Sequence, residues 1–414
     1  MANSLITDQK IALAAIPLWK NTNAMLAMVN QEYTSEFART GAKAGQSIRI
    51  RKPVDYPVQS GPTTTVSDTI ELNTTLTVAT QKNVSMSFSS ADRELAIGEF
   101  TGMFIRPAVN NLAGAVAGDL MAGAEGGSAA FASKNDPTTG ALITPDMFTW
   151  LAAGAAIDLN SVPTPEKVAI THPMSMAASV STFSNLFNSQ SKIGAQYDNG
   201  YITHALGFDW ANDQTVRIHT TGTLATSPTW VAGKGFSFGT VNGASQTGST
   251  LTVTTTTGTL KQGDMIRIAG VNAVNRINKT DTGSLQTFTV TADVASGATS
   301  IPIYPAITPG SGVAYQTVTA SPANSAVIYS ATGPSSQYRK NLVFHPKAIT
   351  LAMVDLASDL AGAQQSRANL DGVSMRVASQ WAFLTDQNPT RLDILYGLAF
   401  LMPEWVATVA DPVS

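Results

Sequence analysis

The chain has 414 residues, of which 43% are apolar and only 13% charged, with a formal net charge of −3 and no cysteine. This length is enough for two or three ordinary domains. The lack of cysteine excludes disulfides and thiolate metal sites, and a slightly acidic chain without a basic patch is not typical of a protein that grips nucleic acid. The first twenty residues show no basic region followed by an apolar core, so no signal peptide is expected, and the most apolar stretch, Pro107–Ala124, is too polar to span a bilayer.

The charged fraction is about half of the usual share, so neutral polar and small residues must cover the surface. One explanation is a β-rich protein with a neutral polar skin. The other is a protein whose surface is mostly contact area for copies of itself, because interfaces are depleted in lysine, glutamate and aspartate.

Residues 1–44 are predicted to form an arm of two short helices. Apolar residues recur there at roughly helical spacing, Ser4, Thr7 or Asp8 can cap the first helix, and Pro17 and Asn21–Asn23 are expected to interrupt it.

Residues 45–90 change to a period of two, which predicts a long two-stranded ribbon. In "SIRIRKPVDYPV" the apolar residues and Tyr56 share one face, and Arg49, Arg51 and Asp55 fall on the other. A turn signal, Ser60-Gly61-Pro62, precedes the second strand, "TIELNTTLTVATQKNVSMSF". A lone hairpin is marginal in water, so the ribbon either packs on its own core or lies across a neighbouring subunit.

Residues 91–128 are predicted to form a long helix with a kink or restart at Arg106-Pro107, and residues 129–219 an α+β core. In that core we expect a helix capped by Thr144, a strand in "KVAIT" and a helix in "HPMSMAASV". Residues 220–332 contain short, regularly spaced strand signals and predict an all-β barrel or sandwich inserted into the host fold. Residues 333–414 resume the α+β style, and "NLVFHPKAITLAMVDL" predicts a strand, a corner at His345-Pro346 and an amphipathic helix.

The residues that could carry chemistry are few and scattered. His172, His204, His219 and His345 lack metal-ligand spacing, and His172-Pro173 and His345-Pro346 are interpreted as corners after a strand rather than as catalytic groups. "DTGS" at Asp281–Ser284 lacks the partner loop of an aspartic protease, and "SQSK" at Ser189–Lys192 lacks the companion motifs of its enzyme class. We therefore predict no catalytic residue, no cofactor and no metal.

Three stretches carry a family resemblance. They are "GTLKQGDMIRIAGVNAVNRINKTDTGSLQTFTVT" (Gly258–Thr291), "NLVFHPKAITLAMVDL" (Asn341–Leu356) and "DQNPTRLDILYGLAFLMPEWVATV" (Asp386–Val409). Together with the order of arm, ribbon, long helix, α+β core and inserted β domain, they resemble the major capsid proteins of tailed double-stranded-DNA bacteriophages, which have the Hong Kong 97-type fold. Within this class the chain is most similar to the coat proteins of short-tailed Salmonella-type phages, which carry an inserted β-barrel domain.

The resemblance implies an α+β capsid fold with the N-terminal arm at 1–44, the extended ribbon at 45–90, the spine helix at 91–128, the axial core at 129–219, the inserted barrel at 220–332 and the returning strands at 333–414. It implies a shell of hexamers and pentamers around double-stranded DNA without sequence-specific binding, guided by a scaffolding protein, with a portal at one vertex, assembled in the bacterial cytoplasm and matured by expansion. Lys52 and Lys82 lie in or beside the ribbon, but no acid is evident to catalyse a covalent crosslink, so we expect the subunits to be locked together without covalent bonds. No membrane partner is expected.

Particular residues follow from this reading. Arg49, Arg51 and Lys52, with Asp55 and Tyr56 beside them, are expected to contact an adjacent subunit, the alternative being a solvated strand face. Gly263 and Asp264 are expected to form a tight turn of the inserted barrel. Two other classes remain open: a β-rich surface or tail-fibre protein, and a hydrolase that uses "DTGS" or "SQSK".

Overall fold

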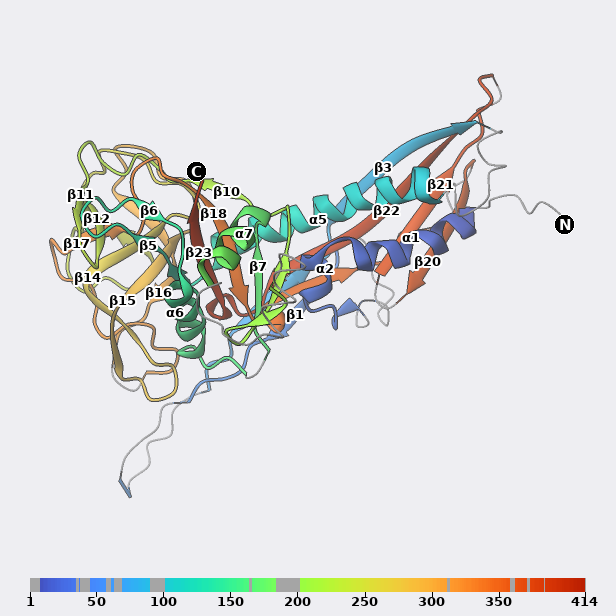
Figure 1. Cartoon of the computed structure of the whole chain (residues 1–414). Helices are drawn as coiled ribbons and strands as arrows, with labels where there is room; N and C mark the ends of the chain where they lie inside the picture. The colour runs from blue at the N-terminus through green and yellow to red at the C-terminus, as the bar shows by residue number, and fades with distance from the viewer. Residues whose placement is uncertain are drawn as a thin grey trace. The chain divides into compact units, whose positions relative to one another are not determined.

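The structure is a computed structural model in which the chain forms two compact units (Figure 1). It describes residues 8–34, 37, 45–56, 61–62, 69–89, 101–163, 166–183, 202–310, 313–357, 362–370, 373–382 and 384–413. Unit 1 is built from the chain up to Arg51, Asn73–Leu120 and Ile349–Leu401. Unit 2 is built from Lys52–Leu72, Met121–Ala348 and the residues from Met402 onward.

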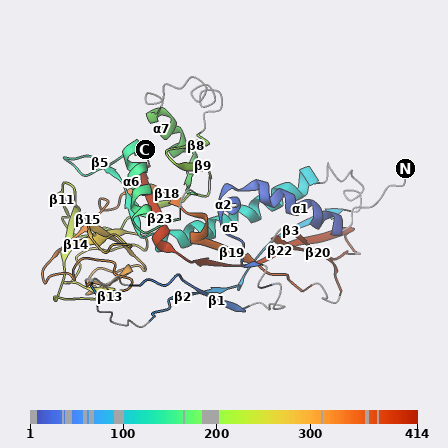
Figure 2. The same ribbon diagram turned by 90° about the horizontal axis from the view of Figure 1, so that it is seen from below.

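Unit 1 is organised around a five-stranded antiparallel sheet in which the long strand β22 is central. The strands are β3 (Thr80–Ser89), β19 (Ile349–Met353), β20 (Gln364–Leu370), β21 (Val373–Ser379) and β22 (Gln387–Phe400). Strand β22 pairs with β19, β21 and β3, so strands far apart in the sequence form one sheet. Figure 2 shows the helices of this unit on one side of the sheet.

The N-terminal arm forms two helices, α1 (Asp8–Thr22) and α2 (Ala24–Met28). The break between them is where the asparagines predicted it, because the Asn23 side chain accepts hydrogen bonds from the backbone of Met25 and Leu26. Pro17, in contrast, lies inside α1 and does not interrupt it, so that part of the prediction is wrong. Helix α1 packs on β20 and β21.

A π-helix, η2 (Thr101–Ile105), passes directly into the long helix α5 (Arg106–Gly127). The change of helix type falls at Arg106-Pro107, where the sequence predicted a restart. The apolar row of Val109, Leu112, Val116 and Leu120 is buried, which explains the helical spacing of these residues.

The ribbon prediction holds for only part of its length. Strands β1 (Ser47–Arg51) and β2 (Asn73–Thr77) form a two-stranded antiparallel sheet. The second half of the predicted strand does not continue this ribbon: it becomes β3, which pairs with β22 over ten residues. Residues 78–79 separate β2 from β3. Because apolar residues keep the same even spacing in both strands, the sequence does not show that β2 and β3 pair with different strands.

Unit 2 contains a mixed sheet covered by two helices. Its strands are β4 (Ala130–Ala132), β7 (Val168–Thr171), β8 (His204–Ala205), β9 (Phe208–Asn212), β10 (Ile218–Thr220), β18 (Gln337–Phe344) and β23 (Val406–Pro412). Helix α6 (Met147–Asp158), helix α7 (Pro173–Phe183) and the sheet enclose a core around Trp150 and Trp210. The cap of α6 is Asp146 rather than the predicted Thr144, because the Asp146 carboxylate accepts from the backbone of Thr149 at 2.9 Å. Strands β5 (Lys134–Asn135) and β6 (Leu142–Ile143) form a small antiparallel hairpin in the same unit, and β6 contacts β23 of the mixed sheet.

The segment after His345 is not the predicted helix. A single 3₁₀ turn, η3 (Pro346–Ala348), leads into strand β19, all five residues of which are buried. A strand buried on both faces shows a continuous apolar run without alternation, so its pattern is indistinguishable from that of a buried helix. A second 3₁₀ turn, η4 (Pro403–Trp405), precedes β23.

Between β10 and β18 the chain forms a separate seven-stranded antiparallel sheet. Its strands are β11 (Thr229–Val231), β12 (Gly235–Thr240), β13 (Gly248–Thr252), β14 (Met265–Val274), β15 (Asp281–Val290), β16 (Ser300–Ile307) and β17 (Val327–Ser330). A bridge between Val241 and Val253 joins β12 to β13 and closes the sheet around its own apolar core. We call this closed sheet the barrel. Among the described helices of the chain, none combines the length and apolarity needed to cross a membrane.

Candidate functional site

A polar junction joins the barrel to the mixed sheet of unit 2 where the chain passes between them. Strands β10 and β18 pair antiparallel, with Thr220 opposite Gln337, so the chain leaves and rejoins the mixed sheet on neighbouring strands. The turn Lys261–Asp264 of the barrel approaches both strands. Gly263 has φ +91°, a left-handed conformation that glycine adopts without strain, and the Asp264 backbone N–H donates to Lys261 O at 3.0 Å.

Asp264 is a fully buried carboxylate whose hydrogen bonds come from three directions. It accepts from the backbone N–H of Lys261 at 2.8 Å, from that of Gly222 at 3.1 Å and from His219 Nε2 at 2.7 Å. Because an ionised carboxylate only accepts, its contact with His219 requires a proton on Nε2. These three donors offset the cost of burying the charge and fix the turn against the base of the barrel.

Lys340, in β18, is the buried cation of the junction. Its Nζ donates to Gly263 O at 2.7 Å. Burial lowers the pKa of Lys340 to about 8, although the negative charges of Glu125 and Asp264 act in the opposite direction. Burial, followed by those same two charges, raises the pKa of the neighbouring Tyr338 well above its ordinary value. The junction thus holds acidic and basic groups out of water and close together.

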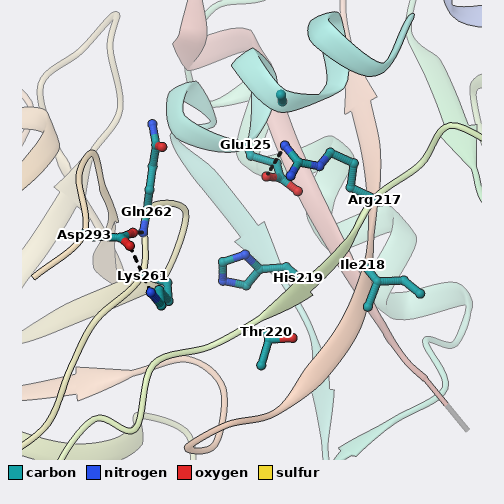
Figure 3. Close-up of a pocket in the computed structure, with 9 residues that line it drawn as sticks. Glu125, Arg217, Ile218, His219, Thr220, Lys261, Gln262 and Asp293 are labelled. Atoms are coloured by element: carbon teal, nitrogen blue, oxygen red, sulfur yellow. Dashed lines mark hydrogen bonds and ion pairs between the residues drawn. The ribbon is translucent and has the colours of Figure 1, made fainter. Parts of the chain in front are cut away.

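A shallow pocket of about 340 Å³ opens beside this cluster. Figure 3 shows His219 at its centre, with the ion pair Arg217–Glu125 (3.4 Å) on one side and Lys261–Asp293 (2.9 Å) on the other. The charged groups that line the pocket are thus paired with each other rather than arranged as nucleophile and base. Within the described residues, no group of His, Asp and Glu is placed to hold a metal ion. The arrangement is suited to joining two parts of a chain.

The predicted contact residues lie on or just beyond β1. Arg49 and Arg51 are exposed on this strand, opposite Thr75 and Asn73, while Ile50 between them is buried. Tyr56 is 58% exposed. Lys52 is half-buried, and its backbone N–H donates to Leu72 O at 2.8 Å.

Asp55 has partners within its own chain. Its carboxylate forms an ion pair with Lys279 of the barrel and accepts from the Tyr315 backbone N–H at 3.1 Å. Sequence alternation placed Asp55 beside the arginines, but the strand ends at Arg51, so the alternation no longer applies there.

The two His-Pro corners share one geometry. Nδ1 of His172 accepts from the Met174 backbone N–H, and Nδ1 of His345 accepts from that of Lys347, each at 3.2 Å. Both side chains thereby cap the turn that follows them. Burial is the largest cause of the lowered pKa of both rings, which favours the neutral form that can accept at Nδ1.

The remaining motifs have local roles or fall outside the described residues. Asp281 of "DTGS" accepts from the Gly283 backbone at 2.7 Å and from Asn272 Nδ2 at 2.9 Å, next to the hairpin between β14 and β15. "SQSK" lies outside the described residues. Lys82 is held by Asp119 at 2.8 Å in unit 1.

Comparisons with known proteins place this architecture. The family model described as P22 coat protein, gene protein 5, matches residues 2–409. A solved structure from Mycobacterium phage Che8 is similar with 10% identity, covering 94% of this chain and 90% of that chain at a TM-score of 0.46. The capsid of cyanophage P-SCSP1u is similar with 11% identity, 90% and 85% coverage and a TM-score of 0.43. The CUS-3 coat protein I-domain is 33% identical over 22% of this chain and 92% of that chain, with a TM-score of 0.18. No curated protein matches the chain.

A family match over almost the whole length defines the class as a bacteriophage major capsid protein with the Hong Kong 97-type fold, whose copies form an icosahedral shell. The chain belongs to the P22 coat protein family. The resemblance found in the sequence is thereby confirmed at the level of family, fold and shell formation.

Proposed function

We propose that copies of this chain join through the ribbon and the N-terminal arm into hexamers and pentamers that enclose double-stranded DNA. A scaffolding protein guides a precursor shell in the bacterial cytoplasm, a portal occupies one vertex, and the shell expands on maturation. Residues 1–44 serve as the arm, 45–90 as the extended ribbon, 91–128 as the spine helix of the peripheral domain and 129–219 as the first part of the axial domain. Residues 220–332 serve as the inserted domain, and 333–414 as the return of the axial domain with the closing peripheral strands.

The exposed distal segment of the ribbon, residues 52–56 and 69–72, is the observation that carries this proposal. Strands β1 and β2 already bury Ile50 and Leu76 within the chain, at 8% and 0% exposure. Beyond them, Tyr56, Ile70 and Leu72 are 58%, 50% and 40% exposed. Neighbouring exposed apolar side chains are typical of an interaction site, and the partner that family membership supplies is another copy of the chain.

The basic residues of β1 would give this contact its specificity. Arg49 and Arg51 are exposed and alternate along the strand, and Lys52 follows them. We expect them to meet acidic residues of an adjacent subunit, since complementary charges fix register between partners. Tyr56 would pack beside them, whereas the Asp55 carboxylate serves the chain's own barrel.

The net charge of the chain is more typical of a shell subunit than of a protein that binds a specific DNA sequence. A net charge of −3 gives little attraction to phosphates, which suits a shell that does not cling to the DNA it encloses. We assign no enzymatic activity, because "DTGS" is occupied by local hydrogen bonds and the junction charges pair with each other.

Electron microscopy tests the proposal directly. The chain is expressed alone and together with a scaffolding protein, and the products are separated by sedimentation and examined in negative stain. We expect closed particles of uniform diameter with the scaffold, and monomers or irregular particles without it. A chain that stays monomeric in both cases, or that forms uniform shells without any scaffold, contradicts the scaffold-guided pathway.

A further inference from the structure

The distal segment of the ribbon, residues 52–56 and 69–72, contacts the barrel of the same chain within unit 2. The central contact is the ion pair between Asp55 and Lys279, whose side chains are only 16% and 11% exposed. The Tyr315 backbone N–H adds a hydrogen bond to the same Asp55 oxygen at 3.1 Å. Because this pair is largely removed from water, salt screens it less than it screens a surface pair.

The Tyr315 hydroxyl contacts both segments of the distal ribbon. It lies 3.3 Å from Pro53 O in residues 52–56 and 3.0 Å from Ile70 O in residues 69–72, and it accepts from the Asp55 backbone N–H at 3.3 Å. The hydroxyl has a single proton and donates it to one carbonyl at a time. It can therefore alternate between Pro53 O and Ile70 O without losing the hydrogen bond from the Asp55 N–H. One side chain of the barrel therefore contacts both of the ribbon segments that continue from β1 and lead into β2.

The two barrel residues that form this contact are held in place by contacts outside the ribbon. Lys279 and Tyr315 have φ +56° and +58°, a left-handed backbone that residues other than glycine adopt only when the surroundings require it. The Arg276 guanidinium lies 6.0 Å from the centre of the Tyr315 ring. The Arg276 backbone N–H also donates to Leu159 O at 3.2 Å, which ties this loop to the end of α6.

We propose that Lys279 and Tyr315 are positioning residues for shell assembly: the barrel grips the distal ribbon of its own chain and holds it in one orientation before a neighbouring copy is met. This inference rests on the proposed role of the ribbon as an intersubunit contact. A flexible ribbon would lose its freedom on each association event, which costs affinity, whereas a ribbon already held in cis has lost that freedom beforehand.

The first test uses the unassembled chain. In Lys279→Met and Tyr315→Phe we expect trypsin to cleave after Arg51 at least several-fold faster than in the wild type, with an unchanged urea midpoint for the chain as a whole. Lys279→Arg keeps the charge and should cleave at close to the wild-type rate. The matched control is Lys261→Met, which removes a lysine from an exposed ion pair on the same barrel. Equal cleavage rates in Tyr315→Phe and wild type overturn the inference.

The second test separates a grip in cis from a contact between copies. Asp55→Lys and Lys279→Asp are prepared singly, mixed with each other, and combined in one chain, and scaffold-driven assembly is followed by light scattering. We expect both single variants to assemble several-fold more slowly, the mixture to remain slow, and the combined variant to recover part of the rate. Recovery in the mixture shows a contact between copies and overturns the cis grip, while leaving the ribbon's intersubunit role standing.

Shell formation gives the last readout. If Tyr315→Phe is cleaved faster but assembles at the wild-type rate, the grip has no positioning role and the inference fails. Failure of the proposed ribbon interface is a separate result: substitutions on β1 would then leave assembly unchanged, whatever the behaviour of Lys279 and Tyr315.

Discussion

Lys340 Nζ lies 2.7 Å from the carbonyl oxygen of Gly263, and both residues are buried. This hydrogen bond joins β18 of the mixed sheet to the turn that opens β14 of the barrel. A lysine in this position has exchanged its hydration for one carbonyl and two nearby carboxylates, so its protonation state is coupled to folding.

The stability of unit 2 should therefore depend on pH in the alkaline range. The folded pKa of Lys340 is about 8 against an ordinary value of 10.5, so between these values the unfolded state binds more protons and the free energy of unfolding rises with pH. From pH 8 to 9.5 the expected gain is on the order of 1.5 kcal/mol, since one pH unit is worth at most about 1.4 kcal/mol. Urea unfolding at a series of pH values measures it.

The slope should disappear in Lys340→Met, which has no proton to lose. Lys261→Met is the control, because Lys261 is about half exposed and should leave the slope unchanged. A wild-type slope that persists in Lys340→Met would assign it to another group.

Gly263→Val should destabilise the barrel more than Gly283→Val does. Both glycines have positive φ, +91° and +72°, so both substitutions incur a backbone cost of about 1–2 kcal/mol. Only at Gly263 would the new Cβ meet another atom, Lys340 Nζ at 2.6 Å, whereas Gly283 faces open space. With overpacking added, we expect a total loss of about 3 kcal/mol for Gly263→Val and insoluble protein on expression. Equal melting of the two soluble variants would show that the turn tolerates a side chain.

Asp119→Asn should weaken unit 1 at neutral pH. Burial pushes the pKa of Asp119 upward, but hydrogen bonds from Lys82 and Tyr396 outweigh it and hold the pKa below 3.8. The stabilisation is therefore complete above the unfolded pKa and is lost as the pH falls through the folded one. We expect a loss of roughly 1 kcal/mol at pH 7 and little difference from wild type at pH 2.

Urea unfolding at the two pH values checks this prediction. Asp293→Asn removes a carboxylate that is also paired with a lysine but is 62% exposed, so its effect should be smaller. A constant deficit for Asp119→Asn at both pH values would point to altered packing instead of lost charge.

Arg51→Glu should impair assembly without unfolding the chain. The side chain is exposed at the end of β1, where water can solvate a carboxylate, and the reversed charge meets like charge at the proposed interface. We expect the assembly rate to fall about tenfold or more, with Arg51→Lys near wild type and circular dichroism unchanged. Normal shells from Arg51→Glu would remove Arg51 from the contact.

Much of the secondary structure could be predicted from the sequence where strands are half-buried. Strand β16 alternates between buried and partly exposed residues along its whole length, and its period of two is visible in the sequence. Strand β19 has five buried residues and no such period, so it was mistaken for a helix. The pairing of β3 with β22 was also missed, because alternation shows which face of a strand is buried but not which strand lies beside it.

The junction was largely out of reach of sequence reasoning. Glu125, His219, Asp264 and Lys340 come from four distant elements, and only folding brings them together. One signal was present: Arg339, Lys340 and Asn341 interrupt a strand whose other residues are mostly apolar, and charged residues in such a position need buried partners. The turn at Gly263 and Asp264 was visible because a glycine followed by aspartate between strands is a local turn pattern.

The pairing of Thr220 with Gln337 makes the intervening 116 residues a removable cassette in the topological sense. Two antiparallel neighbours can be linked by a tight two-residue turn, so the mixed sheet could be closed without the barrel and its strand order would survive. Such a shortened chain would present Glu125 and Lys340 to water, where a pair of charges is easily tolerated. Foreign domains whose own termini lie a strand-spacing apart could be grafted at the same position, which would turn the shell subunit into a carrier for displayed cargo.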